Sequence, residues 1–88
     1  MDDLVRKVLA VAEAERATGV ERIRVRLGAL SHFTPEHFSE HWADASRGTL
    51  AEGAAVDAWL DPGLDGNAAQ GVVLESVVVR ARPSIAAH

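Results

Sequence analysis

Two histidines, His37 and His41, are four residues apart in a segment that we expect to be helical. Residues at this spacing share one face of a helix, so the two imidazoles can clamp a single metal ion. Glu40 falls on a neighbouring face, and His32 is not an evident third ligand unless it swings in. The alternative interpretation is a solvated helix flank, and we favour it because two ligands alone make a weak site.

A ladder of alternating arginines forms the second candidate site. The ladder consists of Arg22, Arg24 and Arg26, and Trp59 is predicted to lie on the same face of the sheet. An exposed tryptophan beside arginines can dock a protein partner, so these residues are our candidate partner-binding surface. Asp57 and Glu75 are available to neutralise the ladder, which favours a cross-strand charge lattice on a solvent-exposed face as the simpler interpretation.

Other chemistry finds little support in the sequence. The absence of cysteine excludes disulfides, thiolate metal sites and cysteine nucleophiles. No serine lies in a nucleophile elbow, and no glycine-rich loop opens a helix in a phosphate-binding pattern. We therefore expect no enzymatic activity.

The net charge and the hydropathy of the chain argue against some classes of partner and some cellular locations. A net charge of −4 argues against sequence-independent nucleic-acid binding. No apolar run approaches the ~18–20 residues that cross a bilayer, and the start at Asp2 and Asp3 is acidic where a secretory signal is basic. We expect a cytoplasmic protein with neither nucleic acid nor membrane as a partner.

Two helices must position the histidines and the acidic start. Leu4, Val8 and Val11 form an apolar stripe that predicts a helix from Asp2 to Ala17, which we expect Gly19 to end in the left-handed conformation. A second helix is predicted to begin after Thr34 as N-cap, with Pro35 at its first position.

The flanks of the second helix carry further signals. Phe33 and Phe38 have the spacing of a hydrophobic staple, and Phe38 and Trp42 are expected to face the core. Gly48 is expected to stop this helix. Thr49 and Glu52 then have the spacing of a capping box on a single further turn.

Three segments alternate or are rich in β-branched residues and so predict strands: 21–27, 54–60 and 72–82. In the second of these, Leu60 is expected on the apolar face. The polar pair Glu75 and Ser76 suits a bulge, and residues 61–71 are expected to form a loop. The connection between the first two strands is long enough for a crossover, which allows them to be parallel.

The element order α-β-α-β-β predicts an α+β fold. We expect a two-layer sandwich in which two helices cover one face of a mixed three-stranded sheet. Residues 1–82 would form a single domain, followed by a tail over 83–88.

An ordered set of short patterns resembles one family. The set comprises RVRLGALS at 24–31, Pro35-Glu36, Phe38, Trp42, Arg47-Gly48-Thr49 and AEGA at 51–54. It is similar to HypA, the family of nickel-incorporation accessory proteins in nickel–iron hydrogenase maturation. The resemblance extends from about Leu4 to Arg80 and implies a nickel-binding-type domain.

The resemblance also shows two departures. The zinc domain of the family, with its paired CxxC motifs, lies between the last two strands, where this chain has only residues 61–71, so no zinc is expected. The family begins Met-His-Glu and binds nickel through the terminal amine, the imidazole and backbone nitrogens. The resemblance therefore places a weakened nickel site at Met1, Asp2 and Asp3, where a carboxylate replaces the imidazole.

Two hypotheses for function follow from the resemblance. The chain assists nickel delivery with the GTPase HypB, the hydrogenase large subunit or both as partners, or it is a docking or scaffold module that has lost metal binding. The open sheet face or an edge strand could also pair two copies as a homodimer.

Overall fold

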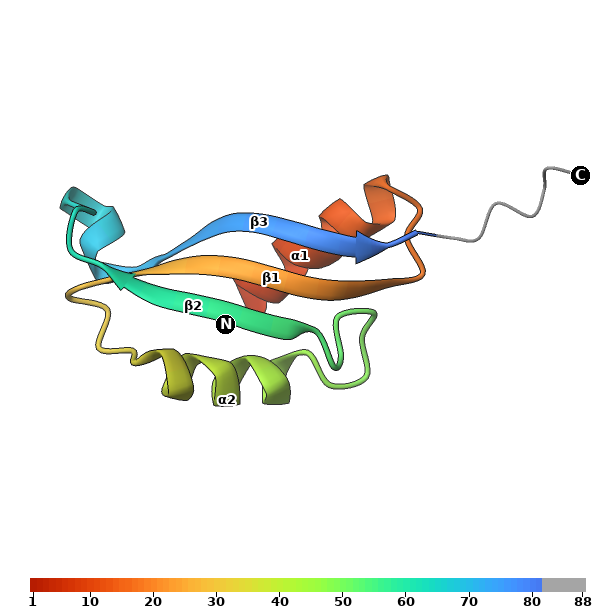
Figure 1. Cartoon of the computed structure of the whole chain (residues 1–88), viewed down its shortest axis with the longest axis horizontal. Helices are drawn as coiled ribbons and strands as arrows, with labels where there is room; N and C mark the ends of the chain where they lie inside the picture. Colours follow the sequence, from red (N-terminus) through yellow and green to blue (C-terminus); the bar gives the residue numbers. More distant parts are fainter. Residues whose placement is uncertain (82–88) are drawn as a thin grey trace, which may run out of the picture.

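The computed structural model describes residues 1–81 and contains the predicted elements in the predicted order (Figure 1). In chain order these are α1 (Asp2–Ala14), β1 (Gly19–Gly28), α2 (Pro35–Ala45), β2 (Ala55–Asp61), the short 3-10 helix η1 (Gly66–Gln70) and β3 (Val72–Arg80). The sheet has the order β2-β1-β3, with β2 parallel and β3 antiparallel to β1. This is the predicted α+β class with a mixed three-stranded sheet.

The alternation of β1 decides which face of the sheet is covered. Ile23, Val25 and Leu27 are fully buried and belong to one core cluster with Val8 of α1 and Phe38 of α2. Both helices therefore cover the same face, with α1 behind β1 and β3 and α2 alongside β2 (Figure 1). The arginines of β1 lie on the other face, which is open.

The first helix ends earlier than predicted. It stops at Ala14 instead of Ala17, and the left-handed residue is Arg16 (φ 52°), not Gly19, which opens β1. The backbone N–H of Thr18 already donates to the carbonyl of Arg80 (2.9 Å), so the chain must complete its reversal before the sheet begins.

The buried stripe of α1 is also rotated from the predicted one. Val5, Val8 and Ala12 are buried, whereas Val11 is 39% exposed and Leu4 is only partly buried. The helix therefore turns a neighbouring face towards the sheet.

The signals at the start of α2 are confirmed. The Thr34 hydroxyl accepts a hydrogen bond from the backbone N–H of His37 (3.1 Å), and Pro35 is the first helical residue. The rings of Phe33 and Phe38 meet edge to face with centroids 5.7 Å apart, which is the predicted staple. These contacts fix the direction in which α2 leaves the preceding loop.

The capping box predicted after α2 forms only in part. Thr49 accepts a hydrogen bond from the N–H of Ala51 (3.1 Å), and the Glu52 carboxylate accepts one from the N–H of Gly48 (2.8 Å). These bonds stabilise successive turns, with no helical segment between Ala45 and β2. The predicted single turn is therefore present and ends at Gly53 (φ 82°), but the two side chains cap backbone N–H groups other than those of a capping box.

The predicted bulge in β3 is confirmed. Arg24 pairs with Ser76 and the next residue, Val25, pairs with Leu74, so Glu75 is the extra residue. Because of the bulge, Glu75 and Ser76 both lie away from the core, and the next residue, Val77, packs against the core again. The observed strand ends at Arg80, and residues 82–88, including the end predicted for this strand and the tail, lie outside the described part of the chain.

Two details differ from the predicted loop and second strand. Leu60 is 50% exposed, because it lies at the end of an edge strand with a neighbour on one side only. Residues 61–71 contain η1, whose backbone presses on Gly28: a Cβ there would lie 2.2 Å from the carbonyl oxygen of Ala69. No described helix is long and apolar enough to cross a membrane.

Candidate functional site

The start of α1 leaves several donor groups free. The carbonyl of Met1 accepts hydrogen bonds from the N–H groups of Leu4 and Val5 (both 3.1 Å), so Asp2 and Asp3 occupy the first helical positions. The first N–H groups of a helix have no partner within the helix, which leaves the two aspartate amides available. Both residues are exposed, so a divalent cation can reach the amine, the amides and the carboxylates from solvent.

A cleft of about 190 Å³ lies beside this helix start. Its lining comes from α1, from the start of α2 and from β3: Met1, Asp3, Lys7, Phe33, Phe38 and Val72 are among its residues. The walls are aromatic and aliphatic, and the charged side chains of Asp3 and Lys7 belong to the same helix. Sequence reasoning missed this cleft, because its walls come together only when both helices pack on the sheet.

The histidine pair lies on the other side of Phe33. The rings of His37 and His41 have centroids 5.6 Å apart, and the ring of His41 meets that of Phe33 edge to face at 5.8 Å. Phe33 therefore contacts His41 and also lines the cleft beside Met1. The two sets of candidate metal ligands thus belong to one end of the fold, separated by one aromatic side chain.

Among residues 1–81, the structure brings no further histidine, aspartate or glutamate side chain to either set. Within residues 1–81, no group of three or more histidine, aspartate or glutamate side chains is gathered closely enough to hold a metal ion. His32, which sequence reasoning left as a conditional third ligand, is exposed and has a left-handed backbone (φ 65°).

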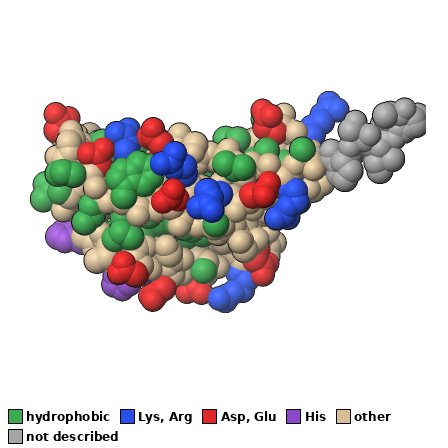
Figure 2. All heavy atoms as spheres, in the orientation of Figure 1, with side chains coloured by type: hydrophobic (Ala, Val, Ile, Leu, Met, Phe, Trp, Pro, Cys, Tyr) green, Lys and Arg blue, Asp and Glu red, His purple; other side chains and the backbone are tan. Residues whose placement is uncertain are grey.

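The arginine ladder is paired with carboxylates across the strands. The Nε of Arg24 lies 3.3 Å from Asp57, and Arg26 contacts Asp61 through Nη1 (3.1 Å) and Glu75 through Nε (3.0 Å). Basic and acidic side chains accordingly alternate over this face in Figure 2. The predicted charge lattice is present, with Asp57 and Glu75 as the predicted partners.

Asp61 is the lattice member that sequence reasoning missed. It was assigned to the loop, whereas the parallel register places it as the last residue of β2, opposite Gly28 and beside Arg26. Only the register between β1 and β2 could have revealed it, and the sequence does not specify that register.

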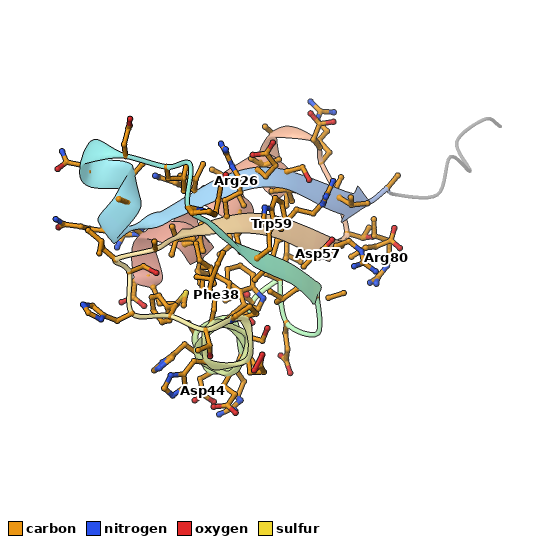
Figure 3. The ribbon with its side chains drawn as sticks, turned by 60° about the vertical axis from the view of Figure 1, so that its left-hand side comes forward. Arg26, Phe38, Asp44, Asp57, Trp59 and Arg80 are labelled. Atoms are coloured by element: carbon orange, nitrogen blue, oxygen red, sulfur yellow. The ribbon has the colours of Figure 1, made fainter. Side chains whose placement is uncertain are left out.

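Trp59 and Arg22 complete the open face in different ways. The guanidinium of Arg24 lies 5.2 Å from the centre of the Trp59 ring and covers part of it, within range of a cation–π contact. Figure 3 shows Trp59 and Arg26 over the strands, with Phe38 on the side of α2. Arg22 is exposed next to Ala55 and Val78 and forms no ion pair with another residue of the described part of the chain.

Comparison with known proteins supports one relationship. No protein family model matches the chain. It is 41% identical over 54 residues to the hydrogenase maturation factor HypA of Archaeoglobus fulgidus, covering 61% of this chain and 49% of that protein. It is 43% identical over 58 residues to HypA of Methylocella silvestris, covering 61% and 51%. The chain thus spans about half the length of these curated relatives, and over that shared part it is similar to HypA proteins.

Proposed function

We propose that this chain is a non-catalytic accessory protein of hydrogenase maturation. The observation that supports the proposal most is its identity of 41–43% to two HypA proteins over three fifths of its length. The fold fits this role, because the exposed features of residues 1–81 include a charged sheet face, a small cleft and candidate metal ligands. The same features suit a protein that binds a cargo and a partner.

The proposed cargo is nickel, bound at the start of α1. The Met1 amine would anchor Ni²⁺, and the backbone amides of Asp2 and Asp3, which lie next to it and have no partner within the helix, would become nitrogen ligands on releasing their protons to solvent. The side chain at position 2 is a carboxylate, a harder ligand than imidazole, so this site is expected to bind nickel weakly. No structural zinc site of the cysteine type is part of the proposal, since the chain has no cysteine.

The proposed partners are the GTPase HypB and the hydrogenase large subunit. The open face around Arg22, Arg24, Arg26 and Trp59 is the surface we assign to such a partner, because it is exposed and carries both charge and an aromatic ring. A homodimer through the same face or an edge strand would compete with this contact.

One observation favours a second function. Position 2 carries a carboxylate in place of an imidazole, which also suits a docking or scaffold module that does not bind metal. Such a module would act through the open sheet face alone.

Calorimetry with Ni²⁺ separates the two functions. The protein with a free Met1 amine is compared with a variant extended by two residues before Met1, in a buffer that does not chelate metal. Nickel delivery predicts a binding event that the extension removes. Absence of binding to either protein would contradict delivery by this chain and leave the docking module as the function.

A further inference from the structure

We propose that His37 and His41 form a second metal site on α2, which takes a borderline divalent transition metal ion such as Ni²⁺, Zn²⁺ or Cu²⁺. The site is separate from the start of α1 and does not depend on the Met1 amine. Its existence can therefore be tested independently of the nickel site proposed above.

The geometry of the pair supports chelation. Both side chains are exposed, and their rings lie side by side, with centroids 5.6 Å apart and planes tilted by 56°. Two imidazoles at i and i+4 on one helix face are a recurring pair of ligands for such ions. No hydrogen bond or ion pair within residues 1–81 engages either imidazole, so a metal ion does not have to displace a polar contact with the protein.

The backbone that carries the two ligands is held in place. The Thr34 hydroxyl caps the helix at the backbone N–H of His37 itself, Pro35 fixes the first helical position, and the buried ring of Phe38 anchors the turn between the histidines. The edge of Phe33 against His41 further restricts that ring. A metal ion therefore meets ligands whose spacing is already set, which lowers the entropic cost of binding.

The charge of α2 also favours a cation. The helix contains three carboxylates, Glu36, Glu40 and Asp44, and no lysine or arginine. Arg47 follows the helix and is paired with Asp44 (2.8 Å). Glu36 and Glu40 are exposed on the turns that carry the histidines, and they raise the local concentration of divalent cations.

The site has two protein ligands, because no third side chain is gathered there within residues 1–81. The remaining coordination positions are therefore filled by water or by a group of another molecule. A metal held in this way can be exchanged, which distinguishes the site from a closed structural site with four protein ligands.

The test moves one histidine while keeping the composition of the chain. The double substitution His41→Ala with Ala43→His retains the number of histidines and the charge, but the imidazole at the exposed position 43, six residues from His37, no longer shares the face of His37. It is made in a chain extended before Met1 and carrying His88→Gln, so that neither the amine nor the C-terminal histidine contributes. Ni²⁺ binding is measured by calorimetry, with His32→Gln as the matched single-histidine control.

We expect the extended parent and His32→Gln to bind one Ni²⁺ with similar affinity. The position-swapped variant, and His37→Gln, should bind at least about tenfold more weakly, the scale on which loss of a supporting group weakens a metal site. Saturating Ni²⁺ should raise the Tm of the parent but not of the swapped variant. Equal binding by parent and swapped variant, or no binding by the extended parent, would overturn the second site. If extension of the native chain before Met1 removes one Ni²⁺ binding event and another is retained, the lost event concerns the first site alone.

Discussion

Arg26 is the centre of the charged face, because it contacts carboxylates from both neighbouring strands. Asp61 reaches it from the end of β2, and Glu75 reaches it from the bulge of β3. The contact with Asp61 is a hydrogen bond, whereas the Nε of Arg26 is close to Glu75 without the alignment of one. These partly exposed pairs are each worth about 0–1 kcal/mol, so they order the open face more than they stabilise the fold.

The first prediction concerns this pairing. Arg26→Met should lower the free energy of unfolding by about 1 kcal/mol, because it leaves two carboxylates without their shared cation. Urea denaturation measures the change. Arg22→Met is the control, since Arg22 has no ion pair within residues 1–81, and should stay within about 0.5 kcal/mol of the parent. The difference between the two variants should shrink in about 1 M salt, where charges are screened within a few ångströms. Equal losses in both variants would contradict the assigned lattice.

The second prediction concerns position 2. Asp2→His should strengthen Ni²⁺ binding at the start of α1 by at least about tenfold, because imidazole is a better ligand for this ion than a carboxylate. The affinity is measured by calorimetry in a His37→Gln background, so that the pair on α2 does not contribute. Asp2→Asn, which removes the carboxylate without adding an imidazole, is the control and should not bind more tightly. An unchanged affinity for Asp2→His would show that the amine and the amides are not arranged to bind nickel.

The elements differ in how far local sequence determines them. The start of α2 could be predicted because its signals are local: Thr34 caps, Pro35 begins the helix, and Phe33 meets Phe38. The end of α1 could not, because the hydrogen bond between Thr18 and Arg80 joins residues far apart in the sequence. The same holds for η1, whose position depends on its contact with Gly28.

The cap of α2 gives the third prediction. Thr34→Ala should destabilise the protein by about 1 kcal/mol, because the N–H of His37 loses its side-chain acceptor. Thr34→Ser keeps a hydroxyl in place and should recover most of the loss. Thermal or urea unfolding of the three proteins measures the series. If serine and alanine were equally destabilising, the threonine methyl group and not the hydrogen bond would be responsible.

The contact between η1 and β1 gives the fourth prediction. Gly28→Ala places a Cβ 2.2 Å from the carbonyl oxygen of Ala69, so backbone must move, at a cost of about 1–3 kcal/mol or more. Gly71→Ala is the control at the other end of η1, where the nearest atom would be 3.7 Å away, an ordinary contact. Urea denaturation should rank Gly28→Ala well below Gly71→Ala. A Gly28→Ala variant as stable as the parent would contradict the close packing of η1 on β1.

At the scale of the whole molecule, one face of the sheet packs against the helices to form the core, and the other face carries charged side chains. The alternation of β1 predicted this division correctly, and the long connection to β2 allowed the parallel pairing that the structure shows. What the sequence could not predict is the meeting of Met1, Phe33 and Val72 at the cleft, because three separate elements contribute to it. Most of the candidate residues can therefore be named from sequence, with Asp61 as an exception, but their assembly is a property of the packed fold.

The central claim, a role in hydrogenase maturation, is tested most directly in a bacterial host that lacks its own HypA. The hydrogenase large subunit is purified from that host with and without this chain, and its nickel content and activity are measured. The account predicts that the chain raises both, with the nickel content lower for the variant extended before Met1 than for the native chain. A large subunit that stays free of nickel and inactive in the presence of a folded, expressed chain would contradict it.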